Sequence, residues 1–291
     1  MKRVAVVTST PTFVEGGHLV MARALVRALR DCGHESELIL TPQNRFGRQG
    51  AAYLAAWLTD VGMGHNNRAV DQVISLRYPS YAVRHDNHVC WLNHTMREYY
   101  DQWDAFSAPL KWKGRIKENA RRRLIHWADH RLLTRNVRKV FTISNTVKAR
   151  LERWGSIRSE ALYPPPPQRP YRCDGYGDYI FAVSRLAPLK RLSLLIEALA
   201  TPEAAGIRCV IAGEGEEHGV LAAQIARHNL SAKVRSCRAW PEYELCGLPR
   251  PRFDHALYFG RSLPAGVGEE RLTSWVPWVP RPRCSACNPV C

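Results

Sequence analysis

Two basic side chains follow a short strand-like run in the second half of the chain. The run Tyr179–Val183 has the β-branched and aromatic residues typical of a strand, and Ser184 and Arg185 come directly after it. A proline-marked loop then leads to Lys190 and to a helix whose apolar positions begin at Leu192. Ligands of open α/β sheets bind beyond the carboxyl ends of the strands, and Arg and Lys are the usual partners of phosphate. The spacing predicts a diphosphate site, with solvated loop charges as the alternative.

A pair of glycines lies between the first predicted strand and the first predicted helix. Val4–Val7 has the pattern of a buried strand, and Gly16 and Gly17 follow it. The helix after them stops at Gly33, and a strand over Leu38–Leu40 completes a βαβ unit. The pair is not the dinucleotide fingerprint Gly-x-Gly-x-x-Gly, but it lets the backbone approach a ligand at the positive end of a helix. An anion or a sugar fits there; the alternative is a turn that requires positive φ.

One histidine stands at the end of a predicted strand in the same half of the chain. Val73–Leu76 and Val89–Leu92 are both strand candidates, and His94 comes two residues after the second. A single histidine is usually a structural hydrogen-bonding residue. Its place at a strand end, in the same domain as the glycine pair, favours a functional role.

The segment 111–139 concentrates the positive charge of the chain. It contains eleven Lys and Arg residues against two acids, Glu118 and Asp129. Apolar residues recur in it at roughly helical spacing, which predicts a basic amphipathic helix or helix pair. Such a helix can lie on an anionic membrane surface, can pack its apolar stripe on the core and leave its cations in water, or can bind nucleic acid. The stripe comprises Leu110, Ile116, Leu124, Ala128 and Leu132, with Trp112 and Trp127 near it.

Length and composition indicate a globular protein with a polyanionic partner. The 291 residues are enough for two domains, and 45% hydrophobic residues are enough for a core. The net charge of +16 favours nucleic acid, an anionic membrane or a phosphorylated substrate. Too few apolar residues follow the basic N-terminus for a signal peptide, and no run reaches the roughly 20 that a membrane-spanning helix needs. We expect a cytoplasmic protein with reduced cysteines.

Four consecutive prolines mark the expected domain boundary. Before them, Val140–Ser144 predicts a strand, and Asn145 or Thr146 is the expected N-cap of the next helix. Gly155 is its expected stop. Pro164–Pro167 can continue neither a strand nor a helix and predicts a stiff, extended connector. Strands and helices alternate again after it, which predicts a second α/β domain.

Together these motifs resemble one enzyme family. In their order and spacing over about residues 1 to 235 they are similar to the retaining nucleotide-sugar glycosyltransferases of GT-B architecture, family 4. The resemblance implies an α/β fold with two Rossmann-like domains facing across a cleft, the acceptor mainly on the first and the donor mainly on the second. It also implies retention without an essential metal, with the nucleotide sugar as co-substrate and no cofactor. The motifs are Gly16-Gly17, Asn93-His94-Thr95 with Arg97-Glu98-Tyr99-Tyr100, the run Val140-Phe-Thr-Ile-Ser-Asn-Thr-Val-Lys, Val183-Ser-Arg-Leu with Lys190-Arg191, and Ile211-Ala-Gly-Glu-Gly.

The resemblance assigns roles by position. Arg185 and Lys190 match the family's basic pair on the donor diphosphate, and the glycine pair matches the loop against the donor's phosphate and sugar. His94 matches a histidine beside the transferred sugar, where it hydrogen-bonds a hydroxyl or steadies developing charge. The resemblance therefore implies the catalytic residues His94, Arg185 and Lys190, the donor-binding residues Gly16, Gly17, Ser184, Arg185, Lys190, Gly213 and Glu214 (the last two beside the nucleoside), and no metal ligand.

The C-terminal residues depart from the family pattern. After Arg235 the chain has eight of its 19 prolines and five of its nine cysteines, but no lysine and no Glu-x7-Glu motif of the kind the family uses on the donor sugar and ribose. We expect an aberrant, out-of-frame continuation that is disordered. Cys284, Cys287 and Cys291 fall short of a four-ligand zinc site. The expected domains are 1–165, the acceptor-side Rossmann-like domain; 166–235, a partial donor-binding Rossmann-like domain; and 236–291, the tail.

Two functions follow from the match and the departure. The first is transfer of a hexosyl group from a UDP- or GDP-sugar to a glycan or lipid-linked acceptor in polysaccharide and cell-envelope biosynthesis. The second is a catalytically inactive homologue that keeps only acceptor or membrane binding. We expect the protein in the cytoplasm, peripheral on the inner face of the plasma membrane if segment 111–139 binds lipid. A third reading, nucleic-acid binding, rests on charge alone.

Overall fold

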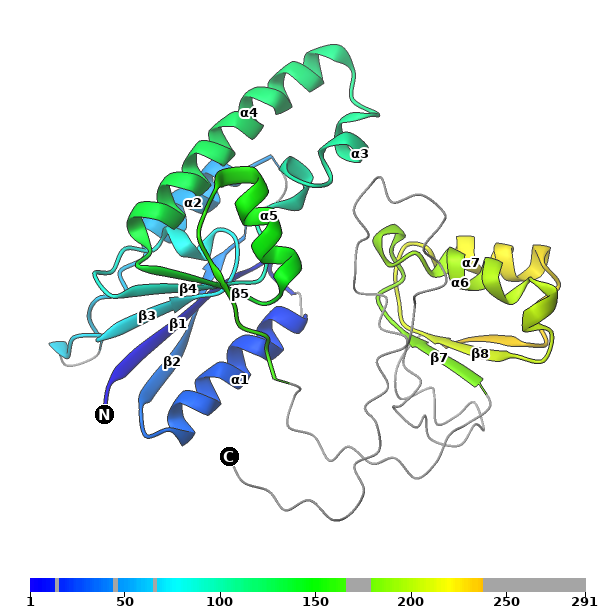
Figure 1. The fold of residues 1–291 in the computed structure, drawn as a ribbon, viewed down its shortest axis with the longest axis horizontal. Coiled ribbons are helices and arrows are strands. Elements are labelled where there is room, and N and C mark those ends of the chain that lie inside the picture. Colours follow the sequence, from blue (N-terminus) through cyan, green and yellow to red (C-terminus); the bar gives the residue numbers. More distant parts are fainter. Residues whose placement is uncertain (14–15, 44–46, 65–66, 166–178, 238–291) are drawn as a thin grey trace. The chain divides into compact units, whose positions relative to one another are not determined.

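The computed structural model describes residues 1–13, 16–43, 47–64, 67–165 and 179–237 (Figure 1). The chain divides into two compact units, Met1–Gln168 and Arg169–Cys291, and each has its own parallel sheet. The predicted connector Pro164–Pro167 lies partly outside the described residues. The two units are described separately below.

The first unit contains a six-stranded sheet in the order β2-β1-β3-β4-β5-β6, and every neighbouring pair is parallel. In β1 all residues between the two ends are buried, because helices cover both faces of the sheet. The strands predicted for this unit are present: β1 and β2 are longer than predicted, and β5 ends at Thr142, two residues before the predicted end. Their bounds are β1 Arg3–Thr10, β2 Glu35–Pro42, β3 Gln72–Ser75, β4 His88–Leu92, β5 Lys139–Thr142 and β6 Glu160–Ala161.

Helices cover both faces of this sheet (Figure 1). One face is covered by α1, whose Ala22 and Val26 pack against Val6 and Trp91. The other face is covered by α2 and α5, and Ile125 of α4 packs against Tyr99, Tyr100 and Trp103. Helix α2 was not predicted from the sequence. The bounds are α1 Gly17–Asp31, α2 Gln49–Leu58, η2 Ser80–Ala82, η3 Arg97–Tyr99, α3 Trp103–Ser107, α4 Trp112–Arg131, the π-helical turn η4 Leu132–Asn136, and α5 Asn145–Gly155.

The side of helix α4 that faces the core is not the apolar stripe identified in the sequence. Its buried residues are Ile125 and Asp129, whereas Ile116 and Leu124 of the predicted stripe are exposed. The alternative in which this stripe packs on the core is therefore wrong for Ile116 and Leu124. The physical reason is that three tyrosine hydroxyls donate hydrogen bonds to the carboxylate of Asp129, and these bonds offset the cost of burying an acid.

The ends of α5 also differ from the predicted ones. Ser144, and not Asn145 or Thr146, is the N-cap, because its Oγ accepts a hydrogen bond from the backbone N–H of Val147 at 3.3 Å. The left-handed residue that ends the helix is Ser156, with a φ of 49°, rather than a glycine. The start of the helix therefore lies one or two residues earlier than predicted, and its stop lies one residue later.

The second unit contains a three-stranded parallel sheet in the order β7-β8-β9. Helices α6 and α7 pack leucine and isoleucine side chains against one face of it. The alternation of strand and helix predicted here is confirmed for the described residues. The bounds are β7 Tyr179–Val183, η5 Pro188–Lys190, α6 Leu192–Leu199, η6 Pro202–Ala204, β8 Arg208–Ala212, α7 His218–Arg227 and β9 Val234–Cys237.

The last described strand extends into the segment that was expected to be a tail. Ser236 and Cys237 are the final two residues of β9. The rest of the expected tail, including Cys284, Cys287 and Cys291, lies outside the described residues. Among the helices that the structure describes, none combines the length and the apolar character needed to span a membrane.

Candidate functional site

The glycine pair begins helix α1 beyond the carboxyl end of β1. Gly16 is the N-cap, with φ −154° and ψ 169°, and its carbonyl accepts the backbone N–H of Leu19 at 2.9 Å. No side chain caps this helix, and its first turn has no acidic residue, so its first N–H groups can bind an anion. Neither glycine has a positive φ, so the alternative of a positive-φ turn is wrong. A Cβ at Gly17 would meet nothing within 4 Å.

His94 is half-buried and lies two residues beyond β4. Its Nδ1 donates to the backbone carbonyl of Thr95 at 2.8 Å, since a carbonyl can only accept, and its Nε2 is therefore an acceptor. Burial is the largest cause that lowers the pKa of His94 from 6.5 to about 4, and the positive charges of Arg77 and Arg97 are smaller causes in the same direction. The imidazole is neutral near pH 7. The glycine pair follows β1 and His94 follows β4, and both strands are parallel to β3, so the glycine pair and His94 lie at the same edge of the sheet.

Three polar groups to which the sequence analysis assigned no role lie at or near the carboxyl ends of neighbouring strands. Arg77 comes directly after Leu76, and burial lowers the pKa of its guanidinium while Glu98 opposes this effect. The Nε of Arg77, the Oδ1 of Asn93 and the Oγ1 of Thr8 are buried without a hydrogen-bond partner in the described part of the chain. Buried polar atoms are seldom left unpaired, so these atoms are candidates for ligand contact. Arg77 could have been identified from the sequence by the same signal as Arg185, because both are cations that directly follow or closely follow a predicted strand.

In the second unit the loops after β7 and β8 are joined through their backbones. The N–H of Ser184 donates to the carbonyl of Ala212 at 3.0 Å, and the N–H of Leu186 donates to the carbonyl of Glu214 at 2.8 Å. Gly213 has a φ of 150°, and a Cβ there would collide with the carbonyl oxygen of Ser184. Only glycine fits because the obstacle is backbone. Gly213 therefore fixes the loop that contains Ser184, in addition to its expected place beside the nucleoside.

Arg185 and Lys190 both lie in the segment that joins β7 to α6. Arg185 is exposed, and Lys190 is the half-buried last residue of η5. Within the described ranges, neither side chain has a hydrogen-bond or ion-pair partner. Arg191 follows in the left-handed conformation, with a φ of 51°, and turns the chain into α6. Two unpaired cations at the carboxyl end of a strand can bind the phosphates of a nucleoside diphosphate.

The predicted site residues form two sets, one in each unit. Each set lies at the carboxyl edge of its own sheet, where open α/β proteins bind ligands. Where the structure describes side chains, no group of three or more His, Cys, Asp or Glu is placed to hold a metal ion. The first set is Gly16, Gly17 and His94, joined by Arg77; the second set is Ser184, Arg185, Lys190, Gly213 and Glu214.

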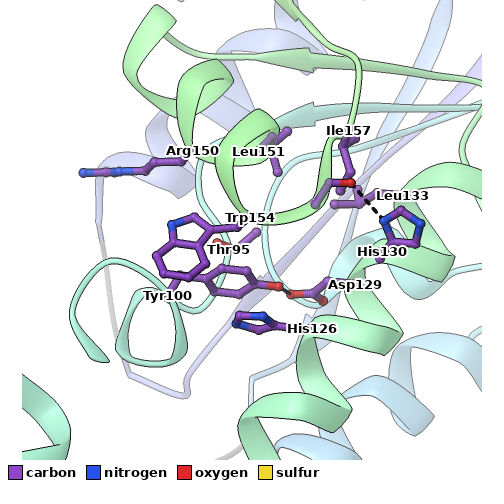
Figure 2. A pocket seen from close by; sticks show the side chains of 11 residues that line it. Thr95, Tyr100, His126, Asp129, His130, Leu133, Arg150, Leu151, Trp154 and Ile157 are labelled. Atoms are coloured by element: carbon purple, nitrogen blue, oxygen red, sulfur yellow. Dashed lines mark hydrogen bonds between the residues drawn. The ribbon is translucent and has the colours of Figure 1, made fainter. Parts of the chain in front are cut away.

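A third group of polar residues joins α4 to α2, η2 and η3, and Figure 2 shows the part of it around Tyr100, His126 and Asp129. The buried carboxylate of Asp129 accepts hydrogen bonds from the hydroxyls of Tyr53, Tyr81 and Tyr100, the last at 2.7 Å. Burial raises the pKa of Asp129 to about 6, although the three hydrogen bonds favour the ionised form. The imidazole of His126 stacks on Tyr100 with ring centroids 4.2 Å apart.

The hollow beside Asp129 is too small for a sugar nucleotide. Its volume of about 20 Å³ has room for about one water molecule. Its charged lining residues also have protein partners: Asp129 is bonded to the tyrosines, and Arg150 pairs with Asp101 at 3.0 Å. This group of residues therefore supports η3 and α4 and is not a substrate site.

No protein-family model and no curated protein matches the chain. Among solved structures, the chain resembles a crystal structure of TarM with a TM-score of 0.51 at 10% identity, over 84% of this chain and 78% of that one. Other matches are the lipopolysaccharide outer core galactosyltransferase WaaB (0.49, 13% identity, 84% and 70% covered) and Alr3699/HepE of Anabaena in complex with UDP and glucose (0.48, 14%, 81% and 69%). The likeness to TarM shows the fold: the chain is an α/β protein of the GT-B type, as predicted.

Proposed function

We propose that the chain is a retaining glycosyltransferase that moves a hexosyl group from a UDP- or GDP-sugar to a glycan or lipid-linked acceptor. One observation carries the proposal. Arg185 and Lys190, with no partner among the described side chains, follow β7 at the carboxyl edge of the second sheet. The GT-B fold agrees with this assignment, but the function is argued from the site because one fold hosts many chemistries.

The two cations act on the leaving group. The bond between the anomeric carbon and the diphosphate oxygen breaks, and its electron pair leaves with the nucleoside diphosphate. Arg185 and Lys190 stabilise the negative charge that develops there, while the sugar becomes oxocarbenium-like. The acceptor oxygen bonds to the anomeric carbon on the same face, and the departing phosphate oxygen takes its proton. This path needs no pair of carboxylates, in contrast to glycoside hydrolysis.

The packed backbone around Gly213 supports this role of the cations. Ser184 and Leu186 on either side of Arg185 are both bonded to the loop after β8. The base of the Arg185 side chain is therefore positioned before the donor binds, and a preorganised charge costs little reorganisation during the reaction. In this proposal the exposed Glu214 on the same loop lies beside the nucleoside.

The edge of the first unit offers polar groups of its own to a ligand. Neutral His94 offers its Nε2 as an acceptor for a sugar hydroxyl, and Arg77 offers a buried Nε–H. The uncapped N-terminus of α1 at Gly16 and Gly17 favours the donor's phosphate or sugar. The reaction uses the nucleotide sugar as co-substrate, with no cofactor. We place it in polysaccharide and cell-envelope biosynthesis on the cytoplasmic side of the plasma membrane.

Titration calorimetry with UDP, GDP and ADP tests the diphosphate assignment. The unaltered chain should bind UDP or GDP. Arg185→Ala and Lys190→Ala should each weaken binding about 10- to 100-fold, because a hydrogen bond to a charged group contributes about 1.5 to 3 kcal/mol. Arg227→Ala, an exposed cation on α7 of the same unit, is the matched control and should leave affinity unchanged.

Two outcomes would contradict the proposal. Equal affinity in the unaltered chain and in both site variants would remove Arg185 and Lys190 from the donor site. Absence of nucleotide binding by the unaltered chain would instead favour the second function, an inactive homologue that keeps only acceptor or membrane binding.

A further inference from the structure

Helix α4 has four large apolar side chains on its solvent-exposed surface. Trp112 is 67% exposed, Ile116 and Trp127 are each 62% exposed, and Leu124 is 61% exposed. Single exposed apolar residues are common, but several on one helix mark an interaction surface. Two of the four are tryptophans, whose large rings contribute strongly to interfaces once they are buried.

These four side chains lie opposite the buried side of the helix. At about 100° per residue, the other three lie within about 120° of Trp112 around the helix axis. The buried Ile125 and Asp129 lie about 220° and 260° from Trp112. We call the side that contains Trp112, Ile116, Leu124 and Trp127 the outer face of α4. Because the opposite side packs on the core, the outer face is available to a partner.

Basic side chains are interleaved with the outer face. Lys113, Lys117, Arg123 and Arg131 are all exposed and lie between about 20° and 140° from Trp112 around the helix. The Nζ of Lys113 is 5.4 Å from the ring centroid of Trp112, a cation–π distance. The outer face is thus both apolar and positively charged.

The two acids of the helix are turned inward. Glu118 accepts hydrogen bonds from Tyr99 at 2.8 Å and from Arg121, and Asp129 is buried beneath three tyrosines. No carboxylate of α4 therefore opposes the positive charge of the outer face. The same inward contacts hold α4 in place before a partner arrives, so docking does not require the helix to form.

We propose that the outer face of α4 docks on a membrane surface that contains anionic lipids. Tryptophan favours the boundary between water and hydrocarbon, and a helix with an apolar face bordered by Lys and Arg lies in that boundary. Anionic headgroups attract the basic side chains. The 20 residues of α4 give a contact about 30 Å long, parallel to the membrane.

The apolar side chains favour lipid over nucleic acid. A phosphate backbone is bound by cations and hydrogen-bond donors, and it offers no place for Ile116 and Leu124. The acyl region of a bilayer accommodates both. The docking surface lies in the first unit, whereas Arg185 and Lys190 lie in the second, so the proposal is independent of donor binding.

Sedimentation of the full chain with vesicles tests the proposal. One set of vesicles is pure phosphatidylcholine, and the other contains phosphatidylglycerol as the anionic lipid. The chain should sediment with the anionic set and stay in solution with the zwitterionic set. Raising the salt concentration should weaken binding, because it screens the attraction.

Two paired variants separate the apolar and the charged contributions. Lys117→Gln with Arg123→Gln should weaken partitioning to anionic vesicles about 25-fold, about fivefold per cation removed. Trp112→Ala with Trp127→Ala should weaken it about tenfold or more. Arg27→Gln is the matched control, because Arg27 is exposed on α1, which covers the other face of the same sheet, and it should partition as the unaltered chain does.

Several results would overturn the docking proposal. These are no binding to anionic vesicles, an unchanged partition coefficient in the tryptophan pair, or an equal loss in Arg27→Gln and the charged pair. A dimer in the analytical ultracentrifuge that the tryptophan pair disrupts would show that a second copy covers the face. Binding of homopolymeric RNA without vesicle binding would favour nucleic acid. Vesicle binding that persists in Arg185→Ala supports the proposal and separates its outcome from that of the donor site.

Discussion

The carboxyl edges of the two sheets present polar groups in different ways. At the first edge His94 and Arg77 are half-buried, and burial is the main cause that lowers the pKa of each. At the second edge Arg185 is exposed, and the close fit is made by the backbone at Gly213 and Gly215. The first edge is therefore preorganised by desolvation of its side chains, whereas the second edge is preorganised by the packing of its loops.

The largest effect should come from the packed loops of the second unit. Gly213→Ala places a Cβ against the carbonyl oxygen of Ser184, and relief requires breaking the backbone bonds between the two loops. We expect a loss of about 3 to 5 kcal/mol in the free energy of unfolding, measured by urea denaturation with circular dichroism. Gly206→Ala, where a Cβ meets nothing within 4 Å, should change it by about 0.5 kcal/mol or less. A similar, small change in both variants would contradict the account.

The pH dependence of stability tests the desolvated edge of the first unit. The pKa of His94 is lowered from 6.5 to about 4, so its contribution is fully present above pH 6.5 and is lost as the pH falls to 4. Relative to His94→Gln, the unaltered chain should lose about 3 kcal/mol of stability over that range. The comparison with the variant removes the effect of other groups, including buried His88. If the difference in the free energy of unfolding between the unaltered chain and His94→Gln were the same at pH 7 and at pH 4.5, His94 would not be desolvated.

Asp129 should show a dependence of the opposite sign. Its pKa is raised from 3.8 to about 6, so the stability it contributes is present below pH 3.8 and is lost as the pH rises through 6. Relative to Asp129→Asn, the unaltered chain should lose about 2 to 3 kcal/mol between pH 4 and pH 7. Urea denaturation at several pH values, followed by tryptophan fluorescence, measures it. If the stability of the unaltered chain relative to Asp129→Asn instead increased with pH, the hydrogen bonds from the tyrosines would outweigh the effect of burial on the pKa of Asp129.

The smallest effect should come from the glycine pair. Gly17→Ala places its Cβ in open space at the start of α1, and Ala is a better helix former than Gly. We expect the variant to be as stable as the unaltered chain or more stable by up to about 1 kcal/mol, in the same urea assay. A loss of more than 1 kcal/mol would show that Gly17 has a structural role like that of Gly213.

The central strand β1 was predictable from the sequence because it is buried on both faces. An apolar run such as Val4–Val7 predicts a parallel strand without knowledge of its neighbours. Residues just past predicted strands, such as His94 and Arg185, could also be identified, since the edge of a parallel sheet follows from where its strands end.

The inner face of α4 could not be predicted because the contacts that bury it come from residues far away in the sequence. Asp129 is buried by hydroxyls from Tyr53, Tyr81 and Tyr100, which lie 76, 48 and 29 residues away in the chain. Periodicity identified a stripe containing Leu124 as one candidate for the core side, but the tertiary hydrogen bonds place Asp129 there instead. The steric requirement at Gly213 was equally hidden, because it depends on how closely two loops approach.

Release of nucleoside diphosphate from UDP-glucose and GDP-mannose is the most direct measure of the central claim, that the second edge activates a nucleotide sugar. The account predicts release by the unaltered chain with at least one of the two donors. Arg185→Ala combined with Lys190→Ala should lower the rate at least about 100-fold, because two charged contacts to the leaving group are lost. Arg227→Ala should keep the full rate. No release with either donor, or the same rate in the double variant as in the unaltered chain, would contradict the claim.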